Sequence, residues 1–149
     1  MIGLLQRVSS ASVTVEGEVI ARIGHGLLVL VGVERGDAEA QAERLIERLL
    51  HYRVFEDDER RMNRSVRDID GELLLVPQFT LAADTERGTR ASFTTAAEPV
   101  RAQDLFLELL DRARDRLPRT QSGRFGADMK VALVNDGPVT FWLRAKPAG

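Results

Sequence analysis

The sequence has no cysteine and only two histidines, His25 and His51, in 149 residues. Without cysteine there is no disulfide framework, no thiolate nucleophile and no cysteine-ligated zinc or iron–sulfur site. Two histidines leave little material for a metal cage or for a Ser-His-Asp triad. No serine lies in a G-x-S-x-G context, so a hydrolase nucleophile elbow is excluded. We therefore expect chemistry without a metal, a cofactor or the usual pair of nucleophile and base.

Long apolar runs are also missing, because no stretch approaches the roughly 18 apolar residues that a membrane-spanning helix needs. Residues 1–7 show no basic region followed by an apolar one, so a secretory signal is not expected. The composition is 44% hydrophobic and 30% charged, which is typical of a globular chain. We expect a cytoplasmic protein with a single domain over residues 1–149.

The sign of the charge changes along the chain. Residues 1–75 hold 10 arginines and 14 acidic residues, whereas residues 76–149 hold 11 basic and nine acidic residues. A basic stretch at residues 112–130 suits an anionic partner that is touched at one place. The alternative is an arginine-rich helix end that faces solvent. The basic residues of this stretch are Arg112, Arg114, Arg116, Arg119, Arg124 and Lys130.

Alternating patterns and short apolar runs predict the strands. Gly17 is expected to close a hairpin, and the continuous apolar runs at residues 27–33 and 73–76 favour strands that are buried on both faces. Residues 56–63 are predicted to form a charged loop. The predicted strands cover residues 2–8, 12–16, 19–23, 27–33, 54–55, 73–76, 129–134 and 139–143.

Two apolar stripes with helical spacing predict two helices. The first begins after Asp37 as N-cap and runs to His51, whose imidazole is expected to cap the helix C-terminus. The second begins with Pro99 and ends at Leu117, and the polar residues 82–97 before it are predicted to form a long loop. Unevenly interleaved strands and helices indicate an α+β fold, with a mixed, strongly curled, barrel-like sheet.

Polar residues follow the buried run at residues 73–76 directly. Pro77 ends the strand, and Gln78 and Thr80 come next, with Phe79 between them. A strand end of this kind can direct backbone N–H groups and an amide at a ligand, as an oxyanion site requires. The alternative is an ordinary strand end whose polar side chains bond to the local backbone.

Asn135-Asp136-Gly137-Pro138 stands between two predicted strands. These residue types favour a hairpin turn, and from the residues alone we predict one here.

Four motifs occur in order along the chain, and together they are more specific than any one of them. In these four motifs the chain resembles the D-aminoacyl-tRNA deacylase (D-tyrosyl-tRNA(Tyr) deacylase) family, and the resemblance extends over essentially its whole length. The motifs are Leu5-Gln6-Arg7-Val8, Gln78-Phe79-Thr80-Leu81 followed by Ala82-Ala83-Asp84, residues 120–129, and Asn135-Asp136-Gly137-Pro138-Val139-Thr140.

The resemblance implies a homodimer in which both chains form each active site. It implies hydrolysis of the ester between a D-amino acid and the 3′ adenosine of tRNA, a chirality proofreading reaction of translation. It also gives the basic stretch a partner, the phosphates of the acceptor stem. The resemblance assigns the reaction to Gln78, Phe79 and Thr80, and substrate binding to Pro77, Gly137, Pro138 and Arg7.

This reaction agrees with the missing nucleophile. An aminoacyl ester is activated, and the vicinal ribose hydroxyl of the tRNA can help to activate water. We expect the backbone N–H groups of Phe79 and Thr80 to act as oxyanion donors, and Thr80 to position the ester or the water. In this family the Gly-Pro bond is cis, and its loop reaches into the partner's site with Arg7 nearby. We expect the carbonyls of Gly137 and Pro138 to reject L-amino acids and to accept glycine.

Two positions depart from the family pattern. Pro77 stands where the family usually has Ser, although a related animal deacylase for mischarged tRNA also carries Pro. Ala91 stands where Pro is common. A competing hypothesis is a catalytically silent RNA-binding module on the same scaffold, and the presence of Gln78, Thr80 and Gly137-Pro138 speaks against it.

Overall fold

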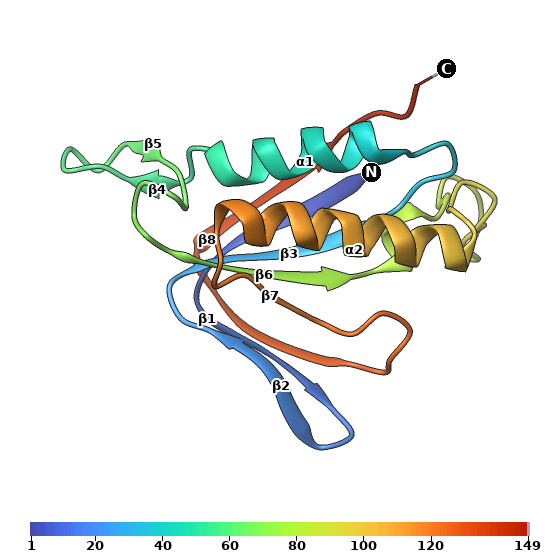
Figure 1. The fold of residues 1–149 in the computed structure, drawn as a ribbon, viewed down its shortest axis with the longest axis horizontal. Helices are drawn as coiled ribbons and strands as arrows, with labels where there is room; N and C mark the ends of the chain where they lie inside the picture. Colours follow the sequence, from blue (N-terminus) through green and yellow to red (C-terminus); the bar gives the residue numbers. More distant parts are fainter. Residues whose placement is uncertain (149) are drawn as a thin grey trace.

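The computed structural model describes residues 1–148, and it confirms the predicted α+β class with a mixed, curled sheet and two main helices (Figure 1). A short 3₁₀ helix, η1, follows the sixth strand. The elements are β1 (Ile2–Val15), β2 (Glu18–Ile23), β3 (Gly26–Gly32), α1 (Glu39–His51), β4 (Phe55–Glu56), β5 (Met62–Arg64), β6 (Glu72–Pro77), η1 (Phe79–Ala82), α2 (Pro99–Arg116), β7 (Gln121–Ser122) and β8 (Lys130–Arg144).

Strand β1 organises the sheet because it is long enough to pair with three other strands. One edge of β1 pairs with β3 near its start and with β2 near its end, and the other edge pairs with β8. All three pairings are antiparallel, whereas β3, β6 and β7 pair in parallel. The strand order is β2-β1-β3-β6-β7, with β8 on β1. The combination of parallel and antiparallel pairs confirms the predicted mixed sheet.

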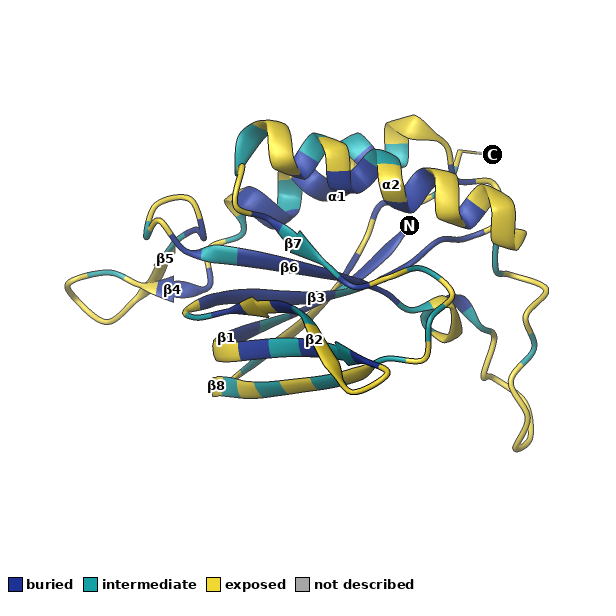
Figure 2. Cartoon of the chain, turned by 60° about the horizontal axis from the view of Figure 1, so that its bottom comes forward, coloured by how far each residue is buried: buried dark blue, intermediate teal, exposed yellow. Residues whose placement is uncertain are grey.

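Both helices cover the same face of the sheet, and the main core lies between them and the strands (Figures 1 and 2). The apolar stripes of α1 and α2 are buried there, as their spacing predicts. A second cluster fills the inside of the curl on the other face. Leu27 points to the first cluster and Leu28 to the second, so β3 is buried on both faces as predicted.

The start of α1 differs from the prediction, because Ala38 and not Asp37 is its N-cap. The side chain of Gln41 accepts the N–H of Ala38 at 2.8 Å. The carboxylate of Asp37 instead accepts hydrogen bonds from the ammonium of Met1 at 2.8 Å and from the N–H of Glu34 at 2.7 Å. A buried cation is a stronger partner for a carboxylate than a helix N–H, which explains the shift by one residue.

The predicted hairpin at Asn135-Asp136-Gly137-Pro138 is wrong. Strand β8 runs past these residues without reversing, and both of its halves pair with β1. Thr140 pairs with Gln6 and Asn135 with Val8, so the four residues between them bulge out opposite a single residue of β1. Turn-forming residues suit a bulge as well as a hairpin, and the length of β1 decides between the two.

Two smaller differences concern the strands. The predicted strands at residues 2–8 and 12–16 are one continuous strand, β1. The predicted loop at residues 56–63 contains part of a small antiparallel pair, β4 with β5. The long loop at residues 82–97 is confirmed apart from η1 at its start and isolated bridges such as Asp84 with Ser92.

The contact between β3 and β6 leaves no room for a side chain at Gly26. A Cβ atom there would lie 1.9 Å from the carbonyl oxygen of Glu72, whereas one at Gly24 would lie 3.4 Å from the flexible carboxylate of Glu72. We expect Gly26→Ala to lower the free energy of unfolding by about 3 kcal/mol, because backbone must move. Gly24→Ala is the matched control and should change it by less than about 0.5 kcal/mol. Urea unfolding measures both, and equal losses would contradict this packing.

Candidate active site

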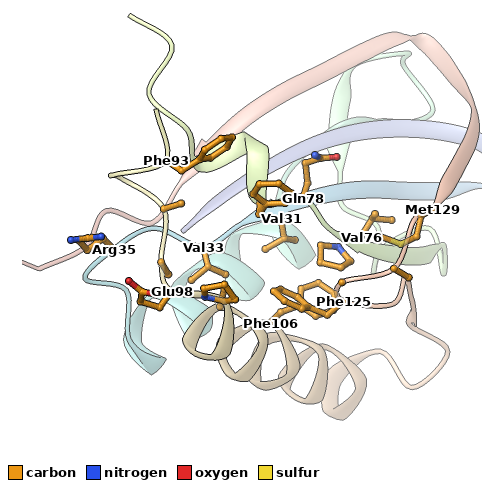
Figure 3. Close-up of a pocket in the computed structure, with 18 of the residues that line it drawn as sticks. Val31, Val33, Arg35, Val76, Gln78, Phe93, Glu98, Phe106, Phe125 and Met129 are labelled. Atoms are coloured by element: carbon orange, nitrogen blue, oxygen red, sulfur yellow. The ribbon is translucent and has the colours of Figure 1, made fainter. Parts of the chain in front are cut away.

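A pocket of about 590 Å³ lies where β3 and β6 end and α2 begins (Figure 3). Its floor is apolar, and side chains from five segments of the chain meet there. The lining residues are Val31, Val33, Arg35, Val76, Pro77, Gln78, Phe79, Phe93, Ala96, Ala97, Glu98, Pro99, Ala102, Phe106, Phe125, Gly126, Ala127, Met129 and Val131.

The loop at residues 82–97 forms one wall of the pocket, and backbone hydrogen bonds attach it to the end of β3. The N–H of Arg35 donates to the carbonyl of Thr95 at 2.9 Å, and the N–H of Ala97 donates to the carbonyl of Val33 at 3.1 Å. The hydroxyl of Thr95 donates to the carbonyl of Ala82 at 2.6 Å. A loop without regular structure is thereby held in one place, and it brings Phe93 to the pocket.

The polar end of the pocket comes from the turn after β6. The N–H of Gln78 donates to the carbonyl of Val31 at 2.8 Å, so the parallel pairing extends one residue beyond the strand. Phe79 and Thr80 then begin η1, and their N–H groups donate to no acceptor within residues 1–148. The side-chain amide of Gln78 donates to the hydroxyl of Thr80. Two free backbone donors and an amide thus stand together.

Gly32 allows η1 to lie close to β3. A Cβ atom at Gly32 would meet the carbonyl oxygen of Gln78 at 3.3 Å and the N atom of Ala82 at 3.2 Å. These are tighter than ordinary contacts, so a side chain here would push η1 away from the strand. Because Gly32 has no side chain, η1 can lie against β3. This contact sets the position of the two free N–H groups relative to the pocket.

The ring of Phe79 is 62% exposed and stands 5.4 Å from the ring of Phe93, centroid to centroid. Both rings line the pocket, and both are exposed, so they stand at its opening. Exposed aromatic rings beside a pocket are typical of a surface that another molecule covers.

Phe125 and Met129 form the opposite end of the pocket (Figure 3). They belong to a segment after β7 that is fastened to β6, because the N–H of Gly123 donates to the carbonyl of Leu75 at 2.8 Å. The sulfur of Met129 accepts the N–H of Arg124 at 3.4 Å. This end of the pocket is therefore apolar and polarizable.

The Gly137-Pro138 bond is cis, as the resemblance implies, and Arg7 lies against this bulge. Arg7 is 9% exposed. Its Nε donates to the carbonyl of Asp136 at 3.1 Å, and its Nη1 donates to the carbonyl of Val54 at 2.7 Å. The side chain of Asn135 closes the bulge by accepting the N–H of Val139 at 3.1 Å. In this chain Arg7 therefore holds the bulge in place.

One chain does not bring the bulge to the pocket. Arg7 pairs with Leu27 near the start of β3, whereas Pro77 pairs with Val31 near its end. Four residues of strand span about 13 Å. Of the predicted site residues, the structure gathers Pro77, Gln78 and Phe79 in the pocket with Thr80 beside them. The predicted substrate-binding residues that lie apart are Arg7, Gly137 and Pro138.

Much of the basic stretch is used within the fold. Arg112 donates to Glu43 at 2.7 Å and Arg116 donates to the same carboxylate, so the two helices are joined. These hydrogen bonds hold the pKa of Glu43 below its ordinary value. Arg119 pairs with Asp70 at 3.3 Å. In the described part of the chain, the two basic residues of the stretch that lie nearest the Phe125–Met129 end of the pocket, Arg124 and Lys130, form no ion pair.

The histidines lie away from the pocket lining. Nδ1 of His51 is 2.8 Å from the carbonyl of Glu47, which confirms the predicted contact at the end of α1. His25 packs edge-on against Phe55. No group of three or more acidic or histidine side chains within residues 1–148 has the arrangement of a metal site.

No helix in the described part of the chain is both long and apolar enough to cross a membrane.

Four aromatic or sulfur-containing residues of the pocket were not predicted as site residues. They come from three separate segments, so no local pattern groups all four. Phe106 belongs to the buried stripe of α2, where it is indistinguishable from the core. The motif at residues 120–129 was the available signal for Phe125 and Met129. The four residues are Phe93, Phe106, Phe125 and Met129.

The fold and the pocket define a small α+β protein whose site offers backbone donors, an amide and apolar surface in place of a side-chain nucleophile and base. Residues 4–144 match the family model described as D-Tyr-tRNA(Tyr) deacylase. The chain therefore belongs to that family. It is 62% identical to a D-aminoacyl-tRNA deacylase of Alkalilimnicola ehrlichii over 148 residues, which are 99% of each chain. It is 59% identical to a D-aminoacyl-tRNA deacylase of Escherichia coli, over 97% of this chain and 99% of the relative.

Solved structures show the same architecture. One described as c-Myc DNA Unwinding Element Binding Protein has a TM-score of 0.94 and 38% identity, and the match covers 98% of this chain and 99% of the other. Another, described as a probable eukaryotic D-amino acid tRNA deacylase, has a TM-score of 0.83 at 17% identity, over 97% and 98% of the two chains. The second likeness supports the fold alone.

Proposed function

We propose that this protein hydrolyses the ester of D-aminoacyl-tRNA and releases free tRNA and a D-amino acid. The observation that carries the proposal is the pair of free N–H groups, on Phe79 and Thr80, at the edge of an apolar pocket. Close relatives over the full chain are named D-aminoacyl-tRNA deacylase. Aminoacyl-tRNA is used in translation, so we place the protein in the cytoplasm.

The chemistry needs little from side chains. Water attacks the ester carbonyl carbon, the bond from that carbon to the ribose oxygen breaks, and the ribose oxygen takes up a proton. The vicinal ribose hydroxyl helps to activate the water. The N–H groups of Phe79 and Thr80 stabilise the negative charge that develops on the carbonyl oxygen, and each such donor contributes roughly 3 kcal/mol in other enzymes. Gln78 and the hydroxyl of Thr80 position the ester and the water.

The apolar part of the pocket suits the terminal adenosine. A base needs a flat apolar surface, and Phe125 and Met129 provide one at the end of the pocket opposite Phe93. The ester would then lie toward Pro77 and Phe79, next to the free N–H groups. The exposed side chains Arg124 and Lys130 lie in the same segment as Phe125 and suit the phosphates of the tRNA.

A second copy of the chain completes the site in this proposal. Strand β8 pairs only with β1 among the described strands, and its other edge is open. It exposes large apolar side chains, with Val134 56% and Trp142 55% accessible. An open edge with exposed apolar side chains is normally covered in a functional protein. Because one chain leaves the bulge at Gly137 and Pro138 far from its own Gln78, we propose that each bulge serves the pocket of the partner.

The bulge would select the hand of the amino acid. Backbone carbonyls are rigid, they accept hydrogen bonds from the substrate ammonium, and they repel a carbon atom placed against them. We propose that the carbonyls of Gly137 and Pro138 occupy the direction in which an L side chain would point. D-amino acids direct only a hydrogen atom there. Glycine has no side chain, so the site cannot reject it by this means.

Hydrolysis rates of three aminoacyl esters on tRNA test the proposed reaction. We expect the purified protein to release D-tyrosine from D-Tyr-tRNA and glycine from Gly-tRNA, and to leave L-Tyr-tRNA intact, with EDTA present throughout. Acid precipitation of the radiolabelled esters measures each rate against spontaneous hydrolysis. Tight binding of the tRNA without loss of any ester would support the silent RNA-binding module instead. Equal hydrolysis of the D and L esters would contradict selection by the bulge.

Pro77 is one of the two positions where this chain departs from the family pattern, and its ring lies at the pocket. A Cβ atom at Gly123 would be 3.3 Å from Cδ of Pro77, so the ring packs on the segment after β7. Pro77→Ser restores a hydroxyl and an N–H but loses this contact. We expect the variant to fold and kcat/KM for D-Tyr-tRNA to change by no more than about tenfold, or about 1.4 kcal/mol. A thousandfold change in either direction would show that this position governs the chemistry.

A further inference from the structure

A second cavity, of about 350 Å³, lies against the first. Phe106 and Phe125 line both cavities, so the two spaces adjoin at these residues. Phe125 is half-buried, and it is presented by a segment that β6 fixes through Gly123. A ligand that fills the first cavity can therefore extend into the second beside Phe125.

The second cavity combines one cation with neutral polar groups. Arg124 is exposed, and its guanidinium has no hydrogen-bonding or ionic partner within residues 1–148. The hydroxyl of Ser122 donates to the carbonyl of Gly123 at 2.7 Å, which leaves its oxygen free as an acceptor. The amide of Gln103 faces the same space from α2. Together these groups offer a cation for a phosphate, and donors and acceptors for the edge of a base.

The apolar side of the cavity suits a flat group. Leu107 lines it from α2 and is 48% exposed, so its side chain is available to a ligand. The ring of Phe125 is also part of the lining. A base that stacks on aromatic and aliphatic side chains gains about 1–3 kcal/mol in single-stranded nucleic-acid complexes.

We propose that this second cavity binds the cytidine that precedes the terminal adenosine of the tRNA, and that Arg124 contacts the phosphate between the two nucleotides. The inference rests on the proposed function, because it requires the terminal adenosine in the first cavity. The phosphate that joins the two nucleotides then lies beside Phe125, where Arg124 is the available cation. The base of the cytidine packs on Leu107, and its edge faces Gln103 and Ser122, which supply both donors and acceptors.

The experiment compares two substrates, of which only one carries the phosphate and the cytidine that the second cavity would bind. One is D-Tyr-tRNA, and the other is the D-tyrosyl ester of adenosine alone, which has neither the phosphate nor the cytidine. We expect Arg124→Ala to raise KM for D-Tyr-tRNA about tenfold with little change in kcat. The rate on the adenosine ester should stay within twofold of wild type. The variant should fold normally, because only the backbone of Arg124 is bonded in the structure.

The salt dependence supplies a readout that a structural role would not change. Loss of one phosphate contact to a single strand should reduce the slope of log(1/KM) against log[salt] by about 0.7. Arg44→Ala is the matched control, since Arg44 is an exposed arginine on α1 whose side chain forms no ion pair among residues 1–148. It should leave both KM and the slope unchanged. Gln103→Leu tests the proposed contact between Gln103 and the edge of the cytidine base. It should raise KM for D-Tyr-tRNA and leave the rate on the adenosine ester unchanged.

The possible outcomes separate the inference from the function. If wild-type protein hydrolyses neither ester, the proposed function and the inference both fail. If wild type is active and Arg124→Ala impairs both esters equally, the cavity belongs to the aminoacyl end and the inference alone is wrong. An unchanged KM for D-Tyr-tRNA in Arg124→Ala also overturns it. A defect confined to D-Tyr-tRNA, with the smaller salt slope, supports it.

Discussion

The parallel pairing of β3 with β6 is the interaction on which the site depends. It begins at Gly26 opposite Glu72 and ends at Val31 opposite Pro77. Both strands are buried on both faces, so their relative register cannot slip without exposing core side chains. Because the two strands end together, the turn that follows Pro77 has a fixed position. The helices supply the walls of the pocket, but this register sets where its donors stand.

Each part of the site is then attached to this pair of strands. The N–H of Gln78 bonds to Val31 and places the start of η1. The N–H of Gly123 bonds to Leu75 and places Phe125 and Met129 at the other end. The loop before α2 is attached through Val33. Donors at one end and apolar surface at the other are the arrangement that an aminoacyl adenosine requires, and no side-chain nucleophile has to be brought among them.

The bulge in β8 follows from a different constraint. Strand β1 is long enough to pair with β8 on both sides of residues 136–139, so these residues protrude instead of reversing the chain. Arg7 stands at the gap in the register and bonds to the backbone of the bulge. Residues 136–138 of the bulge are exposed, and they lie on an edge strand with exposed apolar side chains. Both observations support the proposal that the bulge acts on another copy of the chain.

Local patterns were sufficient for much of this structure. The helical stripes that begin near Asp37 and Pro99, the two buried apolar runs and the strand end at Pro77 depend on neighbouring residues, and they were predicted to within one or two positions. The hairpin at Gly137 was wrong because its residue types fit a bulge equally well, and only the distant strand β1 distinguishes them. Side chains such as Phe106 were missed for a similar reason, since the pocket they line is formed by segments far apart in the sequence.

The most direct test of the central claim, that two chains share each site, is complementation between two inactive variants. One variant carries Gln78→Ala with Thr80→Ala. In the other, residues 136–139 are replaced by a single serine, which restores a regular strand opposite Arg7. After the two are mixed and refolded together at equal amounts, half of the dimers contain one intact site. The account predicts recovery of about a quarter of the wild-type rate on D-Tyr-tRNA. No recovery in the mixture, or full activity of the serine variant alone, would contradict it.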